Sequence, residues 1–140
     1  MVGSRMHYAV PKMLHQAGML ERFYTDAYIG DKPILERALR FIPNKNMPLM
    51  LKKFLMRKEP DIPANKVVSF DIFGIHFLMK MRRLTNVERA YHYFANKMKQ
   101  FNELIISRGL GDSNVVFGFD GASLELFLYA KKRGLVCMLE

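Results

Sequence analysis

The feature that most constrains the fold is the pattern of apolar and polar residues over the last twenty-six positions of the chain. Residues 115–119 (VVFGF) form a short apolar run that is typical of a buried strand, and residues 135–139 (LVCML) predict a second apolar strand. Between them, residues 120–123 predict a tight turn, and residues 124–133 predict a helix that Gly134 ends. Two apolar strands joined by one helix form a βαβ unit. The sequence therefore predicts a parallel sheet flanked by helices, and an α/β fold class.

Polar residues directly follow both of these strands. Asp120 and Gly121 come after the first strand, and Glu140 comes after the second. Ligands of open α/β sheets bind at the carboxyl ends of the strands. The free N–H groups of the helix start can bind an anion or a sugar hydroxyl, and Asp120 can position a hydroxyl group. The alternative is that Asp120 serves only as the N-cap of the helix.

The earlier part of the chain contains further elements of an α/β pattern. Pro11 suits the first turn of a short helix that ends before Gly18. Two β-prone runs follow at 22–25 and 66–70, and proline-punctuated helical segments lie between them. The clearest helix is predicted over 85–108, because Thr85 and Glu88 have capping-box spacing and Gly109 follows the last turn.

The positive charge of the chain is concentrated in its middle. The 140 residues carry a net charge of +9, and the segment from Lys32 to Arg108 contains 16 basic and 6 acidic residues. The rest of the chain is nearly balanced. A localised basic segment predicts an anionic partner, which is a phospholipid, a nucleic acid or a phosphate-bearing ligand.

Several classes of protein are excluded by what the sequence contains. The single cysteine, Cys137, excludes an intrachain disulfide framework and favours a reducing compartment. The apolar runs are too short for a membrane-spanning helix, and the first residues lack the pattern of a signal peptide. The four histidines and one cysteine have no metal-ligand spacing, so no metal site is expected. We therefore expect a cytoplasmic protein.

Segments at both ends of the chain resemble the N-terminal domain of bacterial family-4-type (group 1) glycosyltransferases. The first part of the chain is similar to the opening of that domain, and the last part is similar to a later block. The similar segments are RMHYAVP (5–11), AGMLERFYTD (17–26), VFGF (116–119), GASLE (121–125), KRGL (132–135) and LE (139–140).

The resemblance implies a GT-B fold, in which two Rossmann-like domains enclose the active site. In this family the N-terminal half receives the acceptor. The C-terminal half holds the nucleotide-sugar, which is a co-substrate rather than a resident cofactor. We expect residues 1–140 to be one incomplete Rossmann-like domain, with a basic helical insert at about 32–108 and no second domain. We also expect that this chain alone has no enzymatic activity.

The resemblance also implies site residues and partners. Gly3, Ser4 and His7 correspond to the first loop facing the cleft, where small residues allow a phosphate or sugar to approach the backbone. The alternative there is a frayed terminus beside a solvated histidine. Asp120 is the candidate catalytic residue, and Gly121 and Glu140 are candidate substrate-binding residues. The implied partner is a glycan or glycolipid acceptor of the cell envelope.

The basic, Met- and Phe-rich segment from Pro48 to Arg83 predicts contact with an anionic membrane. The alternative is ordinary core packing below a solvated charged face. A peripheral location on the inner face of the plasma membrane would follow from such contact. The predicted membrane-contact residues are Lys52, Lys53, Arg57, Lys58, Arg82 and Arg83.

Two further expectations concern function and association. The alternative function is a non-enzymatic basic module that binds an anionic membrane or nucleic acid, although no recognisable motif supports nucleic acid as a partner. Exposed apolar surface is expected where a missing domain would pack, and such surface favours self-association.

Overall fold

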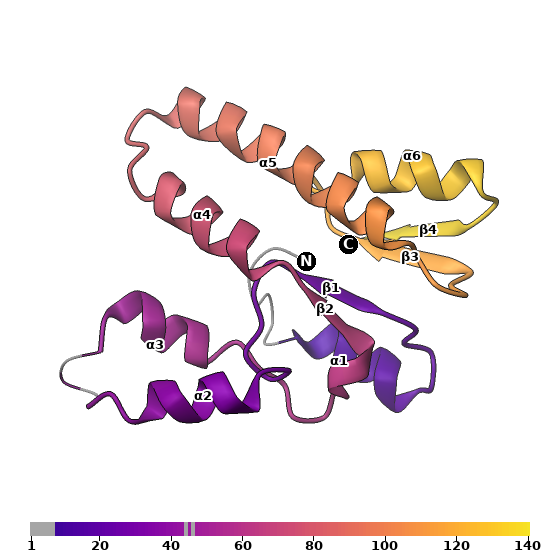
Figure 1. Cartoon of the computed structure of the whole chain (residues 1–140). Helices are drawn as coiled ribbons and strands as arrows, with labels where there is room; N and C mark the ends of the chain where they lie inside the picture. The colour runs from indigo at the N-terminus through magenta and orange to yellow at the C-terminus, as the bar shows by residue number, and fades with distance from the viewer. Residues whose placement is uncertain (1–7, 44, 46) are drawn as a thin grey trace. The chain divides into compact units, whose positions relative to one another are not determined.

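The structure is a computed structural model that describes residues 8–43, 45 and 47–140. It has a mixed α/β fold with short parallel strands (Figure 1). The chain divides between Asp71 and Ile72 into two compact units, here called the N-terminal unit and the C-terminal unit, and each is described by itself. The predicted α/β class is thereby confirmed. That residues 1–140 form one incomplete Rossmann-like domain stays a prediction.

The N-terminal unit is built around two parallel strands. Phe23 pairs with Val67, and Thr25 pairs with Ser69. The two β-prone runs therefore form strands as predicted, and they pair with each other. The elements of this unit are α1 (Ala9–Gln16), β1 (Phe23–Thr25), α2 (Pro33–Arg40), α3 (Leu49–Leu55), the 3₁₀ helix η2 (Ala64–Lys66) and β2 (Val67–Ser69).

Three aromatic rings form the centre of this unit. Tyr8, Phe23 and Tyr28 are buried and meet edge to face, with ring centroids 5.4 to 6.4 Å apart. Pro11 lies in the first turn of α1, as the sequence predicted, and it is buried. Gly18, just beyond this helix, has a φ of +70°, which is a conformation that glycine adopts without strain.

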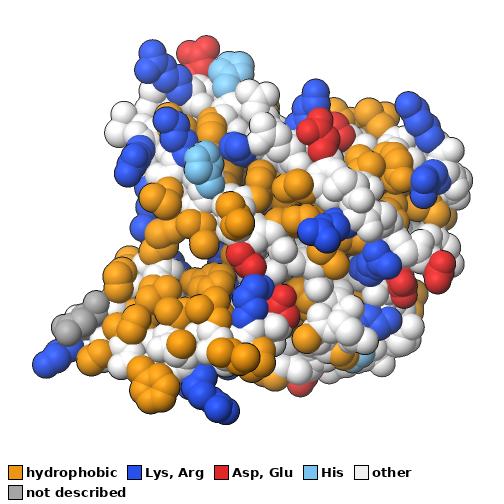
Figure 2. Space-filling model, viewed as in Figure 1, with side chains coloured by type: hydrophobic (Ala, Val, Ile, Leu, Met, Phe, Trp, Pro, Cys, Tyr) orange, Lys and Arg blue, Asp and Glu red, His pale blue; other side chains and the backbone are white. Residues whose placement is uncertain are grey.

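Helices α2 and α3 contribute little to this core. Neither helix has a buried residue, although most of their side chains are apolar. Figure 2 shows the resulting hydrophobic surface over these helices, with Lys and Arg side chains at its margin.

The C-terminal unit contains the βαβ arrangement that the sequence predicted, although β3 is buried only in part and no residue of β4 is buried. Strands β3 and β4 pair in parallel, with Val115 opposite Val136 and Gly118 opposite Leu139. Helix α6 connects them and packs against α5. The elements of this unit are α4 (Asp71–Met81), whose first residue belongs to the N-terminal unit, then α5 (Val87–Arg108), β3 (Val115–Gly118), α6 (Leu124–Lys132) and β4 (Val136–Leu139).

Helix α5 is present as predicted, but its N-terminal cap differs from the prediction. The side chain of Asn86 accepts a hydrogen bond from the backbone N–H of Arg89 at 2.9 Å. The capping box of Thr85 and Glu88 is therefore wrong. The helix begins one residue later than that spacing requires, so Asn86 occupies the capping position. Gly109, with a φ of +75°, ends the helix as predicted.

The apolar stretch before α5 forms helix α4. Phe73 and Phe77 of this helix pack against α5, with the Phe73–Phe101 ring centroids 5.4 Å apart and the Phe77–Phe94 centroids 6.2 Å apart. In the part of the chain that the structure describes, no helix has both the length and the apolar character needed to cross a membrane.

Candidate functional site

The carboxyl edge of the β3–β4 sheet brings together the residues that the sequence selected there. The backbone N–H of Asp120 donates to the carbonyl oxygen of Glu140 at 3.0 Å, and the N–H of Glu140 donates to that of Gly118 at 3.0 Å. We call Asp120, Gly121 and Glu140 the Asp120 edge. All three residues are exposed, so the carboxylates of Asp120 and Glu140 face solvent at the edge where α/β proteins bind ligands.

A buried serine fixes the turn that carries Asp120. The Ser123 hydroxyl accepts a hydrogen bond from the N–H of Phe119 at 3.0 Å and donates to the Phe119 carbonyl at 3.1 Å. Gly121 has a φ of +68°, which the turn requires and glycine provides. Ser123, and not Asp120, occupies the N-cap position of α6. The alternative that Asp120 is only a helix cap is therefore wrong.

Close packing between β3 and α6 holds this turn in place. A Cβ atom at Gly118 would lie 2.8 Å from the Phe127 ring and would also overlap the side chain of Ser123. Only glycine allows the start of α6 to approach the strand this closely. The exposed carboxylate of Asp120 therefore stands on a turn whose base is tightly packed.

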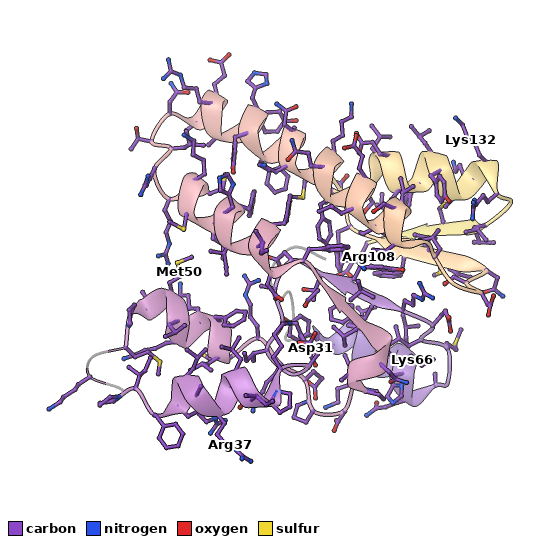
Figure 3. All side chains as sticks on the ribbon, in the orientation of Figure 1. Asp31, Arg37, Met50, Lys66, Arg108 and Lys132 are labelled. Atoms are coloured by element: carbon purple, nitrogen blue, oxygen red, sulfur yellow. The ribbon has the colours of Figure 1, made fainter. Side chains whose placement is uncertain are left out.

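The N-terminal unit has a second group of polar side chains at the carboxyl edge of its sheet. The ammonium group of Lys32 lies 2.6 Å from a carboxylate oxygen of Asp31, 2.8 Å from one of Asp71 and 2.9 Å from the hydroxyl of Ser69. We call Asp31, Lys32, Ser69 and Asp71 the Lys32 cluster; Asp31 is labelled in Figure 3. Asp71 also accepts a hydrogen bond from the N–H of Tyr28 at 2.9 Å.

The electrostatics of the Lys32 cluster favour the charged state of the lysine. Burial alone would lower the pKa of Lys32, but its hydrogen bonds to Asp31 and Asp71 outweigh that effect and raise the pKa. Lys32 therefore stays charged and acts as a cationic link among the acidic residues. A lysine that stays charged does not exchange protons readily, so the Lys32 cluster is better described as a structural ion-pair network than as a proton-transfer site.

Sequence reasoning did not identify the Lys32 cluster, although a signal was present. Asp71 comes two residues after β2, so it obeys the rule that selected Asp120. The pairing of the two strands was the missing information. A lysine between two aspartates is recognisable as a cluster only after strand pairing brings residues near position 30 and position 70 together.

The predicted membrane-contact residues have different surroundings. The guanidinium Nη1 of Arg57 lies 2.8 Å from both carboxylate oxygens of Asp26, and the two side chains are only 12% and 0% exposed. Arg57 therefore forms an ion pair in the interior of the unit, and the prediction that it contacts a membrane is wrong. The ammonium group of Lys58 lies 2.6 Å from Glu36.

The remaining members of that set have side chains that reach solvent. Lys53, Arg82 and Arg83 are exposed, and Lys52 is half-buried. Lys52 and Lys53 belong to the N-terminal unit, and Arg82 and Arg83 belong to the C-terminal unit. Their contact with a membrane stays a prediction.

Three predicted substrate-binding residues, Gly3, Ser4 and His7, lie outside the described residues. Within residues 8–43, 45 and 47–140, no group of three or more His, Cys, Asp or Glu side chains is arranged to hold a metal ion.

Comparison with known proteins identified no relative of this chain. No family model matches the chain, and neither a curated protein nor a solved structure matches it.

Proposed function

We propose that this chain is the acceptor-side, Rossmann-like domain of a GT-B glycosyltransferase. It would serve the transfer of a sugar from a nucleotide-sugar to a glycan or lipid-linked acceptor of the cell envelope. The observation that carries the proposal is the Asp120 edge. There, a strand–turn–helix with family-like residues presents two exposed carboxylates at the carboxyl end of a parallel sheet.

In this proposal Asp120 orients the hydroxyl group of the acceptor. The acceptor oxygen forms a bond to the anomeric carbon of the donor sugar, and the bond from that carbon to the nucleoside diphosphate breaks. The proton of the hydroxyl passes to a base, for which the Asp120 carboxylate is the candidate. The donor is held by a second domain, as the resemblance implies.

Two features of the Asp120 edge support a role in sugar binding. Carboxylates accept hydrogen bonds from sugar hydroxyls, and such charge-assisted bonds are stronger than neutral ones. The tight packing at Gly118 and the hydrogen bonds of Ser123 hold the turn before any ligand arrives. A preorganised turn loses little conformational entropy on binding.

The experiment measures binding of the purified chain to immobilised bacterial lipopolysaccharide and capsular glycans. The strongest binder is then titrated into ¹⁵N-labelled protein. We expect chemical-shift changes centred on Asp120, Gly121 and Glu140. Asp120→Asn should weaken binding about tenfold or more, because it removes a charged acceptor.

Asp112→Asn provides the matched control, since Asp112 is an exposed aspartate in a turn of the same unit. It should change affinity less than about twofold. Equal effects of the two substitutions, or shifts confined to residues far from Asp120, would contradict the proposal. The chain alone should release no nucleoside diphosphate from UDP-glucose or GDP-mannose when an acceptor is present, and measurable transfer would overturn the half-enzyme assignment.

A further inference from the structure

Helices α2 and α3 expose apolar side chains that ordinary amphipathic helices bury. The most exposed are Ile34 at 85%, Phe41 at 81%, Met56 at 70% and Leu49 at 61%. A surface helix normally turns its apolar face to the core and its polar face to water. Here much of the apolar surface of both segments is left on the outside of the N-terminal unit.

On α2 the exposed apolar residues form one stripe. Ile34, Ala38 and Phe41 follow one another at spacings of four and three residues, so they lie on the same face of the helix and its C-cap. All three are exposed. By the same geometry Arg37 lies beside this stripe, and Figure 3 shows its side chain extending away from the helix.

On α3 the exposed apolar residues are interleaved with lysines. Leu49 and Met56 are seven residues apart and occupy one face of the helix and its C-cap. Lys52 and Lys53 fall between them on either side of this line. An apolar side chain can enter a nonpolar layer while such lysines extend their ammonium groups to its charged boundary.

The two helical segments are also strongly basic. Residues 33–58 contain one acidic residue, Glu36, whose carboxylate already accepts from Arg40 at 2.7 Å and lies 2.6 Å from Lys58. Apart from those partners and the internal Arg57, the basic residues that remain are Arg37, Lys45, Lys52 and Lys53.

From these observations we infer that the exposed faces of α2 and α3 form a docking surface for an anionic lipid bilayer. We call this surface the α2–α3 face: Ile34, Arg37, Phe41, Leu49, Lys52, Lys53 and Met56. Its apolar side chains enter the boundary between headgroups and acyl chains, and its cations meet the headgroup phosphates. This inference does not depend on the proposed glycosyltransferase function.

Charge and apolar surface together favour a bilayer over the other occupants. A nucleic acid would match the cations, but it offers no apolar layer for Ile34 and Leu49. A second copy of the chain would cover the apolar stripes, but it would place like charges of two basic surfaces together. Of these three occupants, an anionic membrane complements both properties of the α2–α3 face.

The test measures co-sedimentation of the full chain with vesicles of phosphatidylcholine alone and with vesicles that also contain phosphatidylglycerol. We expect binding to the anionic vesicles, and we expect added salt to weaken it. The double variant Phe41→Ser/Met56→Ser should lose about tenfold or more in partitioning, because two apolar side chains no longer enter the bilayer. The double variant Lys52→Gln/Lys53→Gln should lose about thirtyfold.

Matched control variants lie in the C-terminal unit. Val87→Ser/Tyr91→Ser removes two apolar side chains of comparable exposure from α5. Lys131→Gln/Lys132→Gln removes an adjacent pair of exposed lysines from α6. Both controls should change partitioning less than about twofold. Circular dichroism of all four variants verifies that substitution at these exposed positions leaves the fold intact.

Several results would overturn the inference. One is equal binding to neutral and anionic vesicles, and another is an equal loss in the control variants. Binding of RNA with no binding of vesicles would assign the basic surface to nucleic acid. A change in sedimentation from dimer to monomer in Phe41→Ser/Met56→Ser, again with no vesicle binding by the unmodified chain, would assign the apolar stripes to self-association.

Discussion

At the scale of single residues, the ion pair of Asp26 and Arg57 gives the N-terminal unit a charged interior. Asp26 lies directly after β1, and Arg57 lies just beyond α3, so the pair ties the sheet edge to the helical segment. The backbone carbonyl of Arg57 also accepts from the N–H of Ile29 at 2.9 Å. Removing one member of a buried pair leaves the other charge without compensation.

We predict that Arg57→Ala lowers the free energy of unfolding by about 3 to 5 kcal/mol, measured by chemical denaturation. Arg40→Ala is the control, because Arg40 also pairs with a carboxylate but is mostly exposed. It should cost about 0.5 kcal/mol or less. Losses of similar size in the two variants would show that the buried Asp26–Arg57 pair stabilises the fold no more than an exposed pair does.

Gly118 determines a second property at this scale, the position of the Asp120 turn. We predict that Gly118→Ala costs about 1 to 3 kcal/mol, because the new methyl group overlaps Ser123 and the Phe127 ring. It should also shift the amide resonances of Asp120 and Glu140.

Gly134→Ala is the control for Gly118→Ala, because it introduces backbone strain without a packing overlap. Gly134 has a φ of +74°, and nothing lies within 4 Å of a Cβ atom there. This variant should cost about 1 kcal/mol through strain alone and leave the Asp120 resonances in place. If Gly118→Ala leaves those resonances unmoved, the packing of Gly118 does not position the turn.

At the scale of elements, the start of helix α5 is decided by one side chain. We predict that Asn86→Ala lowers the free energy of unfolding by about 1 kcal/mol, because the N–H of Arg89 loses its acceptor. Thr85→Ala should change it by about 0.3 kcal/mol or less. The measurement is thermal or chemical unfolding. A larger effect of Thr85→Ala than of Asn86→Ala would show that Thr85 caps the helix, as the capping-box spacing predicts.

The same helix shows how far a local pattern can be trusted. Residue periodicity and Gly109 located the helix and its end, because these signals act within a few residues. The cap was misplaced by one residue, since Thr85 and Asn86 are both good capping residues and both have a plausible partner. The choice between them depends on the path of the chain as it leaves α4.

At the scale of the whole molecule, the N-terminal unit should be sensitive to high pH. Burial raises the pKa of Tyr8 from 10.0 to about 12. Because the pKa of Tyr8 is higher in the folded state than in the unfolded state, the free energy of unfolding is highest below pH 10. It falls as the pH rises toward 12, where the unfolded chain ionises first. The shift corresponds to about 2 to 3 kcal/mol. Tyr28, whose pKa burial also raises, contributes in the same direction.

We predict that Tyr8→Phe retains more of its neutral-pH stability at pH 11 than the unmodified chain does, because phenylalanine has no proton to lose. Unfolding by denaturant at pH 7 and pH 11 measures the difference. Tyr91→Phe, at an exposed position of α5, is the control and should leave the pH dependence unchanged. Equal alkaline losses in Tyr8→Phe and the unmodified chain would contradict the prediction.

Local sequence patterns were enough to predict the βαβ order of residues 115–139, the β-prone runs at 22–25 and 66–70, the long helix and the place of Asp120, Gly121 and Glu140. These follow from periodicity and turn chemistry over short distances. Three further features follow from the tertiary fold and not from local patterns. Strand β1 pairs with β2, Asp26 pairs with Arg57 in the interior, and the apolar residues of α2 and α3 stay unburied. Each of these outcomes depends on which distant surfaces meet, and amphipathic spacing marks an apolar face without specifying what covers it.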